Sequence, residues 1–357
     1  MGKNIKIQKL ILILMFLNMS LLATDFTKQY AVRGFINQMV KKQHLNKKEL
    51  QKLFKHVKVQ YRALSIVNPS CKVGSKKTCP PTPAQRARWI RKRDKYKTGT
   101  WTRYAGNLLT NSKVEQGIAF VKKHRGVFQK VYNTYGVPPE YITAIIGVET
   151  AYGKKMGTYP IFDTLATLAF KKNRRNRFYK QELRAFLHMT HRQKLNPRVF
   201  KGSYAGAMGL GQFMPSAYDA YGVDFNKDGK ANMLYVYDSI ASIGNYLQKN
   251  GWRKWEPVAE RVKFKGKRYT KRRTGYKIKY PQSKLKELKL MYGKWSFKGP
   301  VRLIKLDRYN YDELWYGAFN FYVITRYNHN NYYAMTVHQL ARRIRRGYKK
   351  KYGVDLR

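Results

Sequence analysis

Residues 137–153 constrain the fold more than any other part of the chain, because they predict a buried helix with defined ends. The segment reads VPPEYITAIIGVETAYG. Proline is tolerated in the first turn of a helix, so the two prolines suit its start, and Gly153 suits its end. One face of this helix carries, at helical spacing, Ile142, Ile145, Ile146 and Glu149. The segment therefore places a carboxyl group on an apolar stripe.

The carboxyl group of Glu149 is a candidate general acid. Removing a carboxyl group from water favours its neutral form, and a general acid that works near neutral pH needs that form. The alternative is a glutamate that reaches solvent at the helix end or pairs with one of the many arginines of the chain. Spacing alone leaves both interpretations open.

The charge of the chain narrows the class of its partner but not its fold. The 357 residues contain 74 Lys and Arg against 19 Asp and Glu, a formal net charge of +55, which predicts an anionic partner. The 29 Tyr, 17 Phe and 6 Trp supply enough packing surface to exclude the usual charged kind of intrinsic disorder. At roughly 150 residues per domain, the length suggests about two domains, or one large domain with insertions.

The first residues predict export. Residues 1–23 contain three lysines followed by an apolar run from Leu10 to Leu22, which is too short for an ordinary spanning helix of about 20 residues. This layout is typical of a secretory signal peptide, which predicts a periplasmic protein. Leu21 stands where a small residue is preferred before cleavage, so the alternative is an uncleaved anchor in the inner membrane.

The two cysteines of the chain, Cys71 and Cys79, lie in the loop-like sequence PSCKVGSKKTCPP. In an exported chain, two cysteines that close a short loop predict a disulfide. A zinc site is not indicated, because no nearby Cys/His pair accompanies them.

The hydrophobic pattern predicts a predominantly helical protein of the α+β class. Residues 66–100 are rich in Pro, Lys and Arg and predict an exposed connection. Alternating basic and apolar side chains at Arg261 to Lys265 and at Tyr276 to Tyr280 predict short strands. Helical spacing of apolar residues predicts short helices within 26–65 and longer helices at 113–134, 139–152, 161–171, 176–192 and 315–346.

A glycine-rich segment, KGSYAGAMGLGQFMPSAY at residues 201–218, is a candidate ligand-binding loop. Its four glycines would let the backbone approach a ligand closely, and Gln212 can both donate and accept hydrogen bonds. It is not a phosphate loop, because the Lys and Ser/Thr of that motif are missing at the required spacing. The alternative is close helix packing through small residues.

The sequence DFNKDGK is a candidate calcium loop. Asp224, Asn226 and Asp228 occupy positions 1, 3 and 5 of such a loop, and Lys230 occupies position 7, where only the main-chain carbonyl is needed. Position 12 is Tyr235, so the bidentate acid of the ordinary loop is missing. The alternative is a loop stabilised by neighbouring Lys and Arg.

Three blocks of the chain together resemble the membrane-bound lytic murein transglycosylase B family. They are GVPPEYITAIIGVETAYG, SYAGAMGLGQFMPSAY and NFYVITRYNHNNYYAMTVHQL, in that order, within a match from about Trp101 to Arg346. The resemblance implies a lysozyme-like catalytic core. It implies the domains 1–23 (signal peptide or anchor), 24–100 (N-terminal helical region), 101–255 (core with an EF-hand-like loop), 256–306 (small basic β insertion) and 307–357 (C-terminal helical part of the core).

The resemblance also implies the reaction. This family cleaves the β-1,4 bond between N-acetylmuramic acid and N-acetylglucosamine in peptidoglycan and leaves a 1,6-anhydromuramic end. The single catalytic carboxyl would be Glu149, acting first as acid and then as base on the C6 hydroxyl of the sugar itself, whereas most glycosidases need two carboxyls. Asp163 and Glu182 do not resemble a family nucleophile.

Further site residues follow from the same resemblance. Sugar-contacting positions would be Tyr104, Ser203, Gln212, Tyr246, Tyr327, Asn328 and Tyr333. Arg174 and Arg175 would hold stem-peptide carboxylates. Phe178 replaces a tyrosine of the family and so removes one hydroxyl. The family's longer EF-hand-like loop would add Asp238 to the calcium ligands. Core packing is the alternative for each tyrosine.

These observations weigh against the other functions that composition permits. Basic residues interleaved with aromatic ones suit a nucleic-acid groove, but the signal peptide argues against it. The remaining alternative is a non-catalytic peptidoglycan-binding or scaffolding protein of the cell wall. The expected partners are peptidoglycan glycan strands, and the sequence is also compatible with binding to cell-wall synthesis or division proteins. Nucleic acid is not an expected partner. A membrane is expected as a partner only if the signal segment is retained. Calcium is the expected cofactor, and no organic cofactor is expected.

Overall fold

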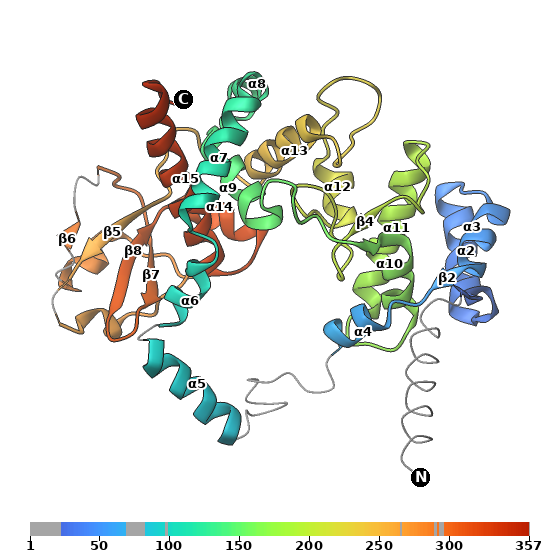
Figure 1. Cartoon of the computed structure of the whole chain (residues 1–357), viewed down its shortest axis with the longest axis horizontal. Helices are drawn as coiled ribbons and strands as arrows, with labels where there is room; N and C mark the ends of the chain where they lie inside the picture. Colours follow the sequence, from blue (N-terminus) through green and yellow to red (C-terminus); the bar gives the residue numbers. More distant parts are fainter. Residues whose placement is uncertain are drawn as a thin grey trace, which may run out of the picture. The chain divides into compact units, whose positions relative to one another are not determined.

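The computed structural model describes residues 23–68, 83–96, 99–264, 266–288, 291–292 and 296–356. It divides into two compact units, each made of two stretches of chain (Figure 1). Unit 1 comprises Met1–Val73 and Met156–Leu234, and unit 2 comprises Gly74–Lys155 and Tyr235–Arg357. Helices predominate and the sheets are small, which confirms the predicted fold class. The expected signal segment, up to residue 22, and both cysteines lie outside the described residues.

Unit 1 is a helical body with two short two-stranded sheets. Its core includes edge-to-face contacts of Phe54 with Phe35, Phe162 and Phe170. These contacts join the N-terminal helices to the later part of the unit. Its elements are β1 (Ala23–Thr24), α2 (Tyr30–Gln43), α3 (Lys47–Lys55), β2 (Val57–Lys58), α4 (Tyr61–Val67), β3 (Tyr159–Pro160), α10 (Ile161–Phe170), α11 (Asn176–Arg192), β4 (Lys201–Gly202) and α12 (Pro215–Tyr221), with the 3-10 turn η1 (Phe26–Lys28).

Unit 2 combines a helical body with a four-stranded antiparallel sheet. Helix α9 packs against α7 and α15, and α13 packs against α8. Its helices are α5 (Pro83–Tyr96), α6 (Thr100–Gly106), α7 (Asn111–Lys123), α8 (Arg125–Tyr135), α9 (Pro139–Thr150), α13 (Val236–Lys249), α14 (Phe319–Tyr327) and α15 (Asn331–Tyr352). Its strands and 3-10 turns are β5 (Ala259–Lys263), η2 (Arg268–Lys271), η3 (Gln282–Leu288), β6 (Met291–Tyr292), β7 (Arg302–Asp307) and β8 (Asp312–Gly317).

Helix α9 has the start that its sequence predicts, but it ends two residues before the predicted position 152, and its C-cap is Ala151 rather than Gly153. It begins at Pro139 and ends at Thr150, and Ala151 follows in the left-handed conformation with φ of 49°. Burial extends around the helix beyond the predicted apolar face, because α7 and α15 both cover it. Among the described residues, no helix is both long enough and apolar enough to cross a bilayer.

The sheet has the strand order β6-β5-β8-β7, and it corrects two expectations. Residues 276–280 do not form a strand: the main chain of Tyr276 bonds to side chains, with its N–H donating to Asn331 and its carbonyl accepting from Arg302. Residues 315–317 belong to β8, so the C-terminal helical region begins at Phe319.

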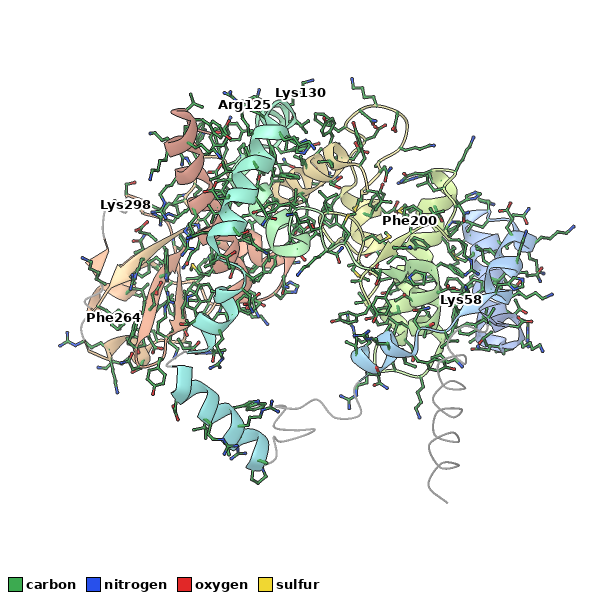
Figure 2. The ribbon with its side chains drawn as sticks, in the orientation of Figure 1. Lys58, Arg125, Lys130, Phe200, Phe264 and Lys298 are labelled. Carbon is green, nitrogen blue, oxygen red and sulfur yellow. The ribbon has the colours of Figure 1, made fainter. Side chains whose placement is uncertain are left out.

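Two further segments differ from the expected helices and connections. The expected helix at 113–134 is two helices, because α7 ends at Lys123 and α8 begins at Arg125. The expected exposed connection at 66–100 contains α5. Basic side chains are exposed in both units, among them Lys58 in unit 1 and Arg125, Lys130 and Lys298 in unit 2 (Figure 2).

Candidate active site

Glu149 lies in the last turn of α9 and is partly buried. The hydroxyl of Tyr333 donates a hydrogen bond to its Oε1 atom over 2.7 Å, although 184 residues separate the two. Tyr333 is itself buried and lies in the first turn of α15, where Asn330 caps the helix by accepting from the N–H groups of Tyr332 and Tyr333. The packing of α15 on α9 therefore creates this contact.

Burial raises the pKa of Glu149 to about 7, and the hydrogen bond from Tyr333 opposes this by favouring the carboxylate. Burial and the nearby Glu149 charge raise the pKa of Tyr333 well above its ordinary value, so this hydroxyl stays protonated and remains a donor. Because Tyr333 donates to Oε1, the acidic proton of neutral Glu149 is left to Oε2. A carboxyl in this state exists in both protonation states near neutral pH.

Three of the expected sugar-contacting tyrosines form one group beside Glu149. Tyr327 stacks on Tyr333, with ring centroids 6.4 Å apart and planes 9° from parallel. Tyr246 meets Tyr327 edge-on at 4.9 Å and donates to the carbonyl oxygen of Arg326. Asn328 directly follows α14 as its C-cap and is exposed. Burial, and secondly the Glu149 charge, raise the pKa of Tyr104, which places it within electrostatic range of the carboxylate.

Asp307 is a residue of this neighbourhood that the sequence did not indicate. At the end of β7 it accepts a hydrogen bond from the N–H of Thr100, the first residue of α6, over 2.7 Å, and another from the hydroxyl of Tyr332. The Tyr332 ring lies 5.6 Å from that of Tyr104. Asp307 thus holds the helix that carries Tyr104 and the residue next to Tyr333. The scarcity of acids in this chain was the one available signal.

A close junction supports this arrangement. A Cβ atom on Gly99 would lie 2.2 Å from the carbonyl oxygen of Arg308, so only glycine fits where α6 begins. The Arg308 guanidinium donates to the carboxylate of Glu313 over 2.7 Å. The main chain that follows β7 therefore packs closely against the start of α6 and fixes its position.

Ser203 and Gln212 belong to unit 1, on a tightly folded loop. The hydroxyl oxygen of Ser203 accepts from the N–H of Ala207 over 3.0 Å. Gln212 has a φ of 48°, and its Nε2 donates to the carbonyls of Met156 and Gly209. Its main chain is therefore in a conformation that few residues other than glycine adopt freely.

The glycines around this loop allow close approach of backbones. A Cβ on Gly157, whose φ is 94°, would lie 2.1 Å from the carbonyl oxygen of Gly202. A Cβ on Gly209 would lie 2.5 Å from the carbonyl oxygen of Met233. Helix packing also contributes, because a Cβ on Gly206 would lie 2.5 Å from a side-chain carbon of Leu165 in α10.

Arg174 and Arg175 line a separate pocket of about 430 Å³ in unit 1, together with Tyr179 and Tyr204. The Arg175 guanidinium lies 4.1 Å from the centre of the Phe178 ring. Phe178, the departure from the family pattern, thus supports Arg175 through its ring face.

The candidate calcium loop is ordered by its own acids. The Asp224 carboxylate accepts from the N–H groups of Asp228 and Gly229, and Asn226 donates to Asp228 over 2.9 Å. Asp238 lies buried in α13, in unit 2. Among the described residues there is no group of three or more His, Cys, Asp or Glu placed to hold a metal, so a cation here would rely on Asn226 and main-chain oxygens as well. This oxygen-only donor set fits a hard cation such as calcium.

Two further acids of unit 1 have structural roles. Asp163 is buried and pairs with Arg198 at 2.7 Å. Glu182 is buried and accepts from both the N–H and the hydroxyl of Ser216. Both carboxylates therefore bond to other residues of unit 1.

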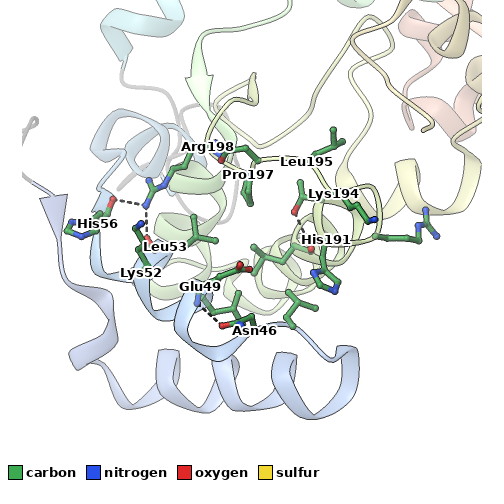
Figure 3. A pocket seen from close by; sticks show the side chains of 16 residues that line it. Asn46, Glu49, Lys52, Leu53, His56, His191, Lys194, Leu195, Pro197 and Arg198 are labelled. Atoms are coloured by element: carbon green, nitrogen blue, oxygen red, sulfur yellow. Dashed lines mark hydrogen bonds between the residues drawn. The ribbon is translucent and has the colours of Figure 1, made fainter. Parts of the chain in front are cut away.

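A pocket of about 920 Å³ in unit 1 lies between α3 and the residues that follow α11 (Figure 3). Arg198 crosses it and donates to the carbonyl oxygens of Leu53 and His56. None of the expected site residues lines this pocket.

Comparisons with known proteins agree with the resemblance in the three blocks. The family described as "Transglycosylase SLT domain" matches residues 27–342. The membrane-bound lytic murein transglycosylase B of Escherichia coli (strain K12) is 35% identical over 328 residues, which are 92% of this chain and 86% of the relative.

Solved structures are similar over nearly the whole chain. The Escherichia coli lytic transglycosylase SLT35 in complex with calcium is 34% identical with a TM-score of 0.78, over 93% of this chain and 97% of that one. The soluble lytic transglycosylase SltB1 from Pseudomonas aeruginosa is 31% identical with a TM-score of 0.76, over 89% of this chain and 99% of that one. The chain therefore belongs to the transglycosylase SLT domain family.

Proposed function

We propose that the protein is a peptidoglycan lytic transglycosylase in which Glu149 is the catalytic acid and base. It would cleave the β-1,4 bond between N-acetylmuramic acid and N-acetylglucosamine and leave a 1,6-anhydromuramic end. The observation that carries this proposal is the partly buried Glu149 carboxyl with a pKa of about 7, held by the Tyr333 hydroxyl. Family membership supports the reaction class.

The chemistry needs one carboxyl. Neutral Glu149 gives its proton to the glycosidic oxygen as the bond to C1 of the muramic residue breaks. The C6 hydroxyl oxygen of the same sugar then bonds to C1, and its proton passes to the Glu149 carboxylate. The acid is regenerated and no water is consumed. The hydrogen bond from Tyr333 stabilises the carboxylate formed between the two steps.

Each unit carries residues that we propose contact sugar. We assign Tyr104, Tyr246, Tyr327, Asn328 and Tyr333 of unit 2 to sugar contacts, together with Ser203 and Gln212 of unit 1. Arg174 and Arg175, which line the pocket beside Tyr204, would bind stem-peptide carboxylates.

The test of this proposal uses peptidoglycan as the substrate. Purified protein is incubated with sacculi, and the released muropeptides are analysed by mass spectrometry. We expect anhydro ends. Reducing ends would instead make the enzyme a hydrolase, and binding without release would make it a scaffolding protein. An exported protein, periplasmic or attached to the inner membrane, would meet this substrate.

Tyr333→Phe should move the basic limb of the activity profile to higher pH. In the wild-type protein the hydrogen bond from Tyr333 favours the Glu149 carboxylate and partly offsets the effect of burial on the pKa. The variant lacks this hydrogen bond, so the pKa of Glu149 rises further. The protonated acid therefore persists to higher pH. The measurement is turnover against pH, with Tyr311→Phe on the exposed surface as the control. An unmoved or lowered limb would show that Tyr333 does not act on the catalytic proton.

Calcium would be a structural ion bound in unit 1 by Asp224, Asn226, Asp228 and the carbonyl of Lys230. The complex of the relative SLT35 with calcium supports this proposal. A ligand that binds only the folded state at about 100 times its Kd stabilises by about 2.7 kcal/mol, so melting temperature should rise with calcium and fall with chelator. Asp224→Asn should abolish the difference. Equal melting temperatures with calcium and with chelator, together with no bound metal, would show that the loop does not bind calcium.

A further inference from the structure

Trp255 is a large apolar side chain in an unusual position. It is 74% exposed and has a φ of 70°, in the left-handed region. A positive φ is a genuine outlier for a bulky side chain and strains the main chain. Because the indole is mostly in solvent, burial does not offset this strain.

The turn that presents Trp255 is firmly held. Asn320, which is fully buried, accepts from the N–H of Arg253 over 2.9 Å and donates to the carbonyls of Arg253 and Glu256. The N–H of Glu256 closes the turn onto the carbonyl of Arg253. The fold therefore holds in one place the main chain that carries the exposed indole, as a preorganised binding group requires.

Polar and charged groups surround the ring. Its edge-to-face contact with Tyr132 has a centroid distance of 6.3 Å, and the Lys254 ammonium lies 5.1 Å from the ring centre. A pocket of about 640 Å³ adjoins it, lined by Arg253, Glu256, Glu260 and Ser296 among others. The Oε2 atom of Glu256 is buried and has no hydrogen-bond partner within the described part of the chain.

This combination suits a sugar polymer better than a protein surface. The core of a protein interface is a contiguous apolar patch depleted of charge. Here the Trp255 ring stands among hydrogen-bonding groups, and its aromatic neighbours are Tyr132 and, in the pocket lining, Phe297. An aromatic face packs on sugar C–H groups, carboxylate oxygens accept from hydroxyl and N-acetyl N–H groups, and a lysine or arginine attracts stem-peptide carboxylates.

We infer that Trp255 and the adjoining pocket form an accessory binding site for glycan strands, outside the catalytic site. The inference rests on peptidoglycan being the substrate, as proposed above. Trp252, three residues earlier, packs on Tyr141 in the first turn of α9, whereas Glu149 lies in its last turn, about 12 Å further along the helix. The site thus holds a part of the polymer that is not being cleaved.

The test is Trp255→Gly in the Glu149→Gln background, in which the polymer stays intact. Co-sedimentation with purified sacculi at about 0.5 M salt screens the nonspecific attraction of the basic surface. We expect binding at least fivefold weaker than in the parent, while melting temperature is unchanged or higher, since glycine relieves the strain. Trp255→Phe should keep most of the binding. Tyr311→Ala, which removes another exposed ring of unit 2, should leave it unchanged.

A second measurement separates this site from the catalytic one. With Glu149 intact, Trp255→Gly should lower the rate on sacculi but not on short soluble glycan fragments. Unchanged binding to sacculi in Trp255→Gly would overturn the accessory site and leave the proposed reaction untouched. Absence of anhydro ends from the parent enzyme would reject the proposed reaction, while the binding comparison would still decide the accessory site.

Discussion

Replacing Glu149 by glutamine should reduce the release of anhydro-muropeptides from sacculi by at least about a thousandfold, within the range that general acid–base catalysis contributes. Glutamine keeps the size of the side chain and an oxygen that accepts from Tyr333. It has no acidic proton to give to the glycosidic oxygen and cannot then take the proton of the C6 hydroxyl. Binding to sacculi should be retained. Substantial release by the variant would show that another group is the acid.

The stability of this variant serves as its control. Burial raises the pKa of Glu149 from 4.5 to about 7, so the folded state disfavours the carboxylate relative to the unfolded chain. This destabilisation grows as pH rises above 4.5 and is complete above about pH 7. Glu149→Gln should therefore melt at a higher temperature than the parent at pH 8 and show no such gain at pH 4. A lower melting temperature at pH 8 would indicate a damaged fold.

Asp307→Ala should lower turnover by about 10- to 100-fold, because small displacements of positioned groups can cost this much. The change leaves the N–H of Thr100 and the hydroxyl of Tyr332 without their acceptor. Helix α6 and the start of α15 are then less firmly held, and with them Tyr104 and Tyr333. The measurement is turnover on sacculi under conditions where the melting curve shows the variant to be folded.

Asp307→Asn is the matched variant, because its carboxamide oxygen can still accept one of the two hydrogen bonds. It should retain more activity than the alanine variant and keep the pH profile of the parent more closely. Equal activity of Asp307→Ala and the parent would mean that α6 is held without this carboxylate. A loss that merely follows the unfolded fraction would leave Asp307 with a role in stability alone.

The local pattern predicted the start and the existence of α9 well, because its prolines and its isoleucine spacing act within the helix itself, whereas the predicted end at Gly153 was wrong because Ala151 is the C-cap. The contact of Glu149 with Tyr333 joins residues 184 positions apart, and no local pattern carries that information. Resemblance to the family supplied both residues, while packing of α15 on α9 supplies their geometry. The sequence did not predict the role of Asp307, because its hydrogen-bond partners lie at the starts of two helices that are distant in sequence.

The strand expected at 276–280 shows how alternation can mislead. Tyr276 and Tyr280 alternate with basic residues, as in a strand with one covered face. Tyr280 pairs with Val301 through a single bridge, and the Tyr280 hydroxyl donates to the carbonyl of Arg273. The alternation arises because one side of an irregular segment faces the core of the sheet region, where Tyr280 packs.

The dependence of α9 on α15 has a consequence for how the protein is made. The partner that covers α9 and brings Tyr333 to Glu149 consists of residues 331–352, and 184 positions separate the two bonded residues. A nascent chain therefore cannot close this core before residues 331–352 have left the ribosome. The hydrogen bond from Tyr333 to Glu149 therefore forms only once α15 is available to pack on α9.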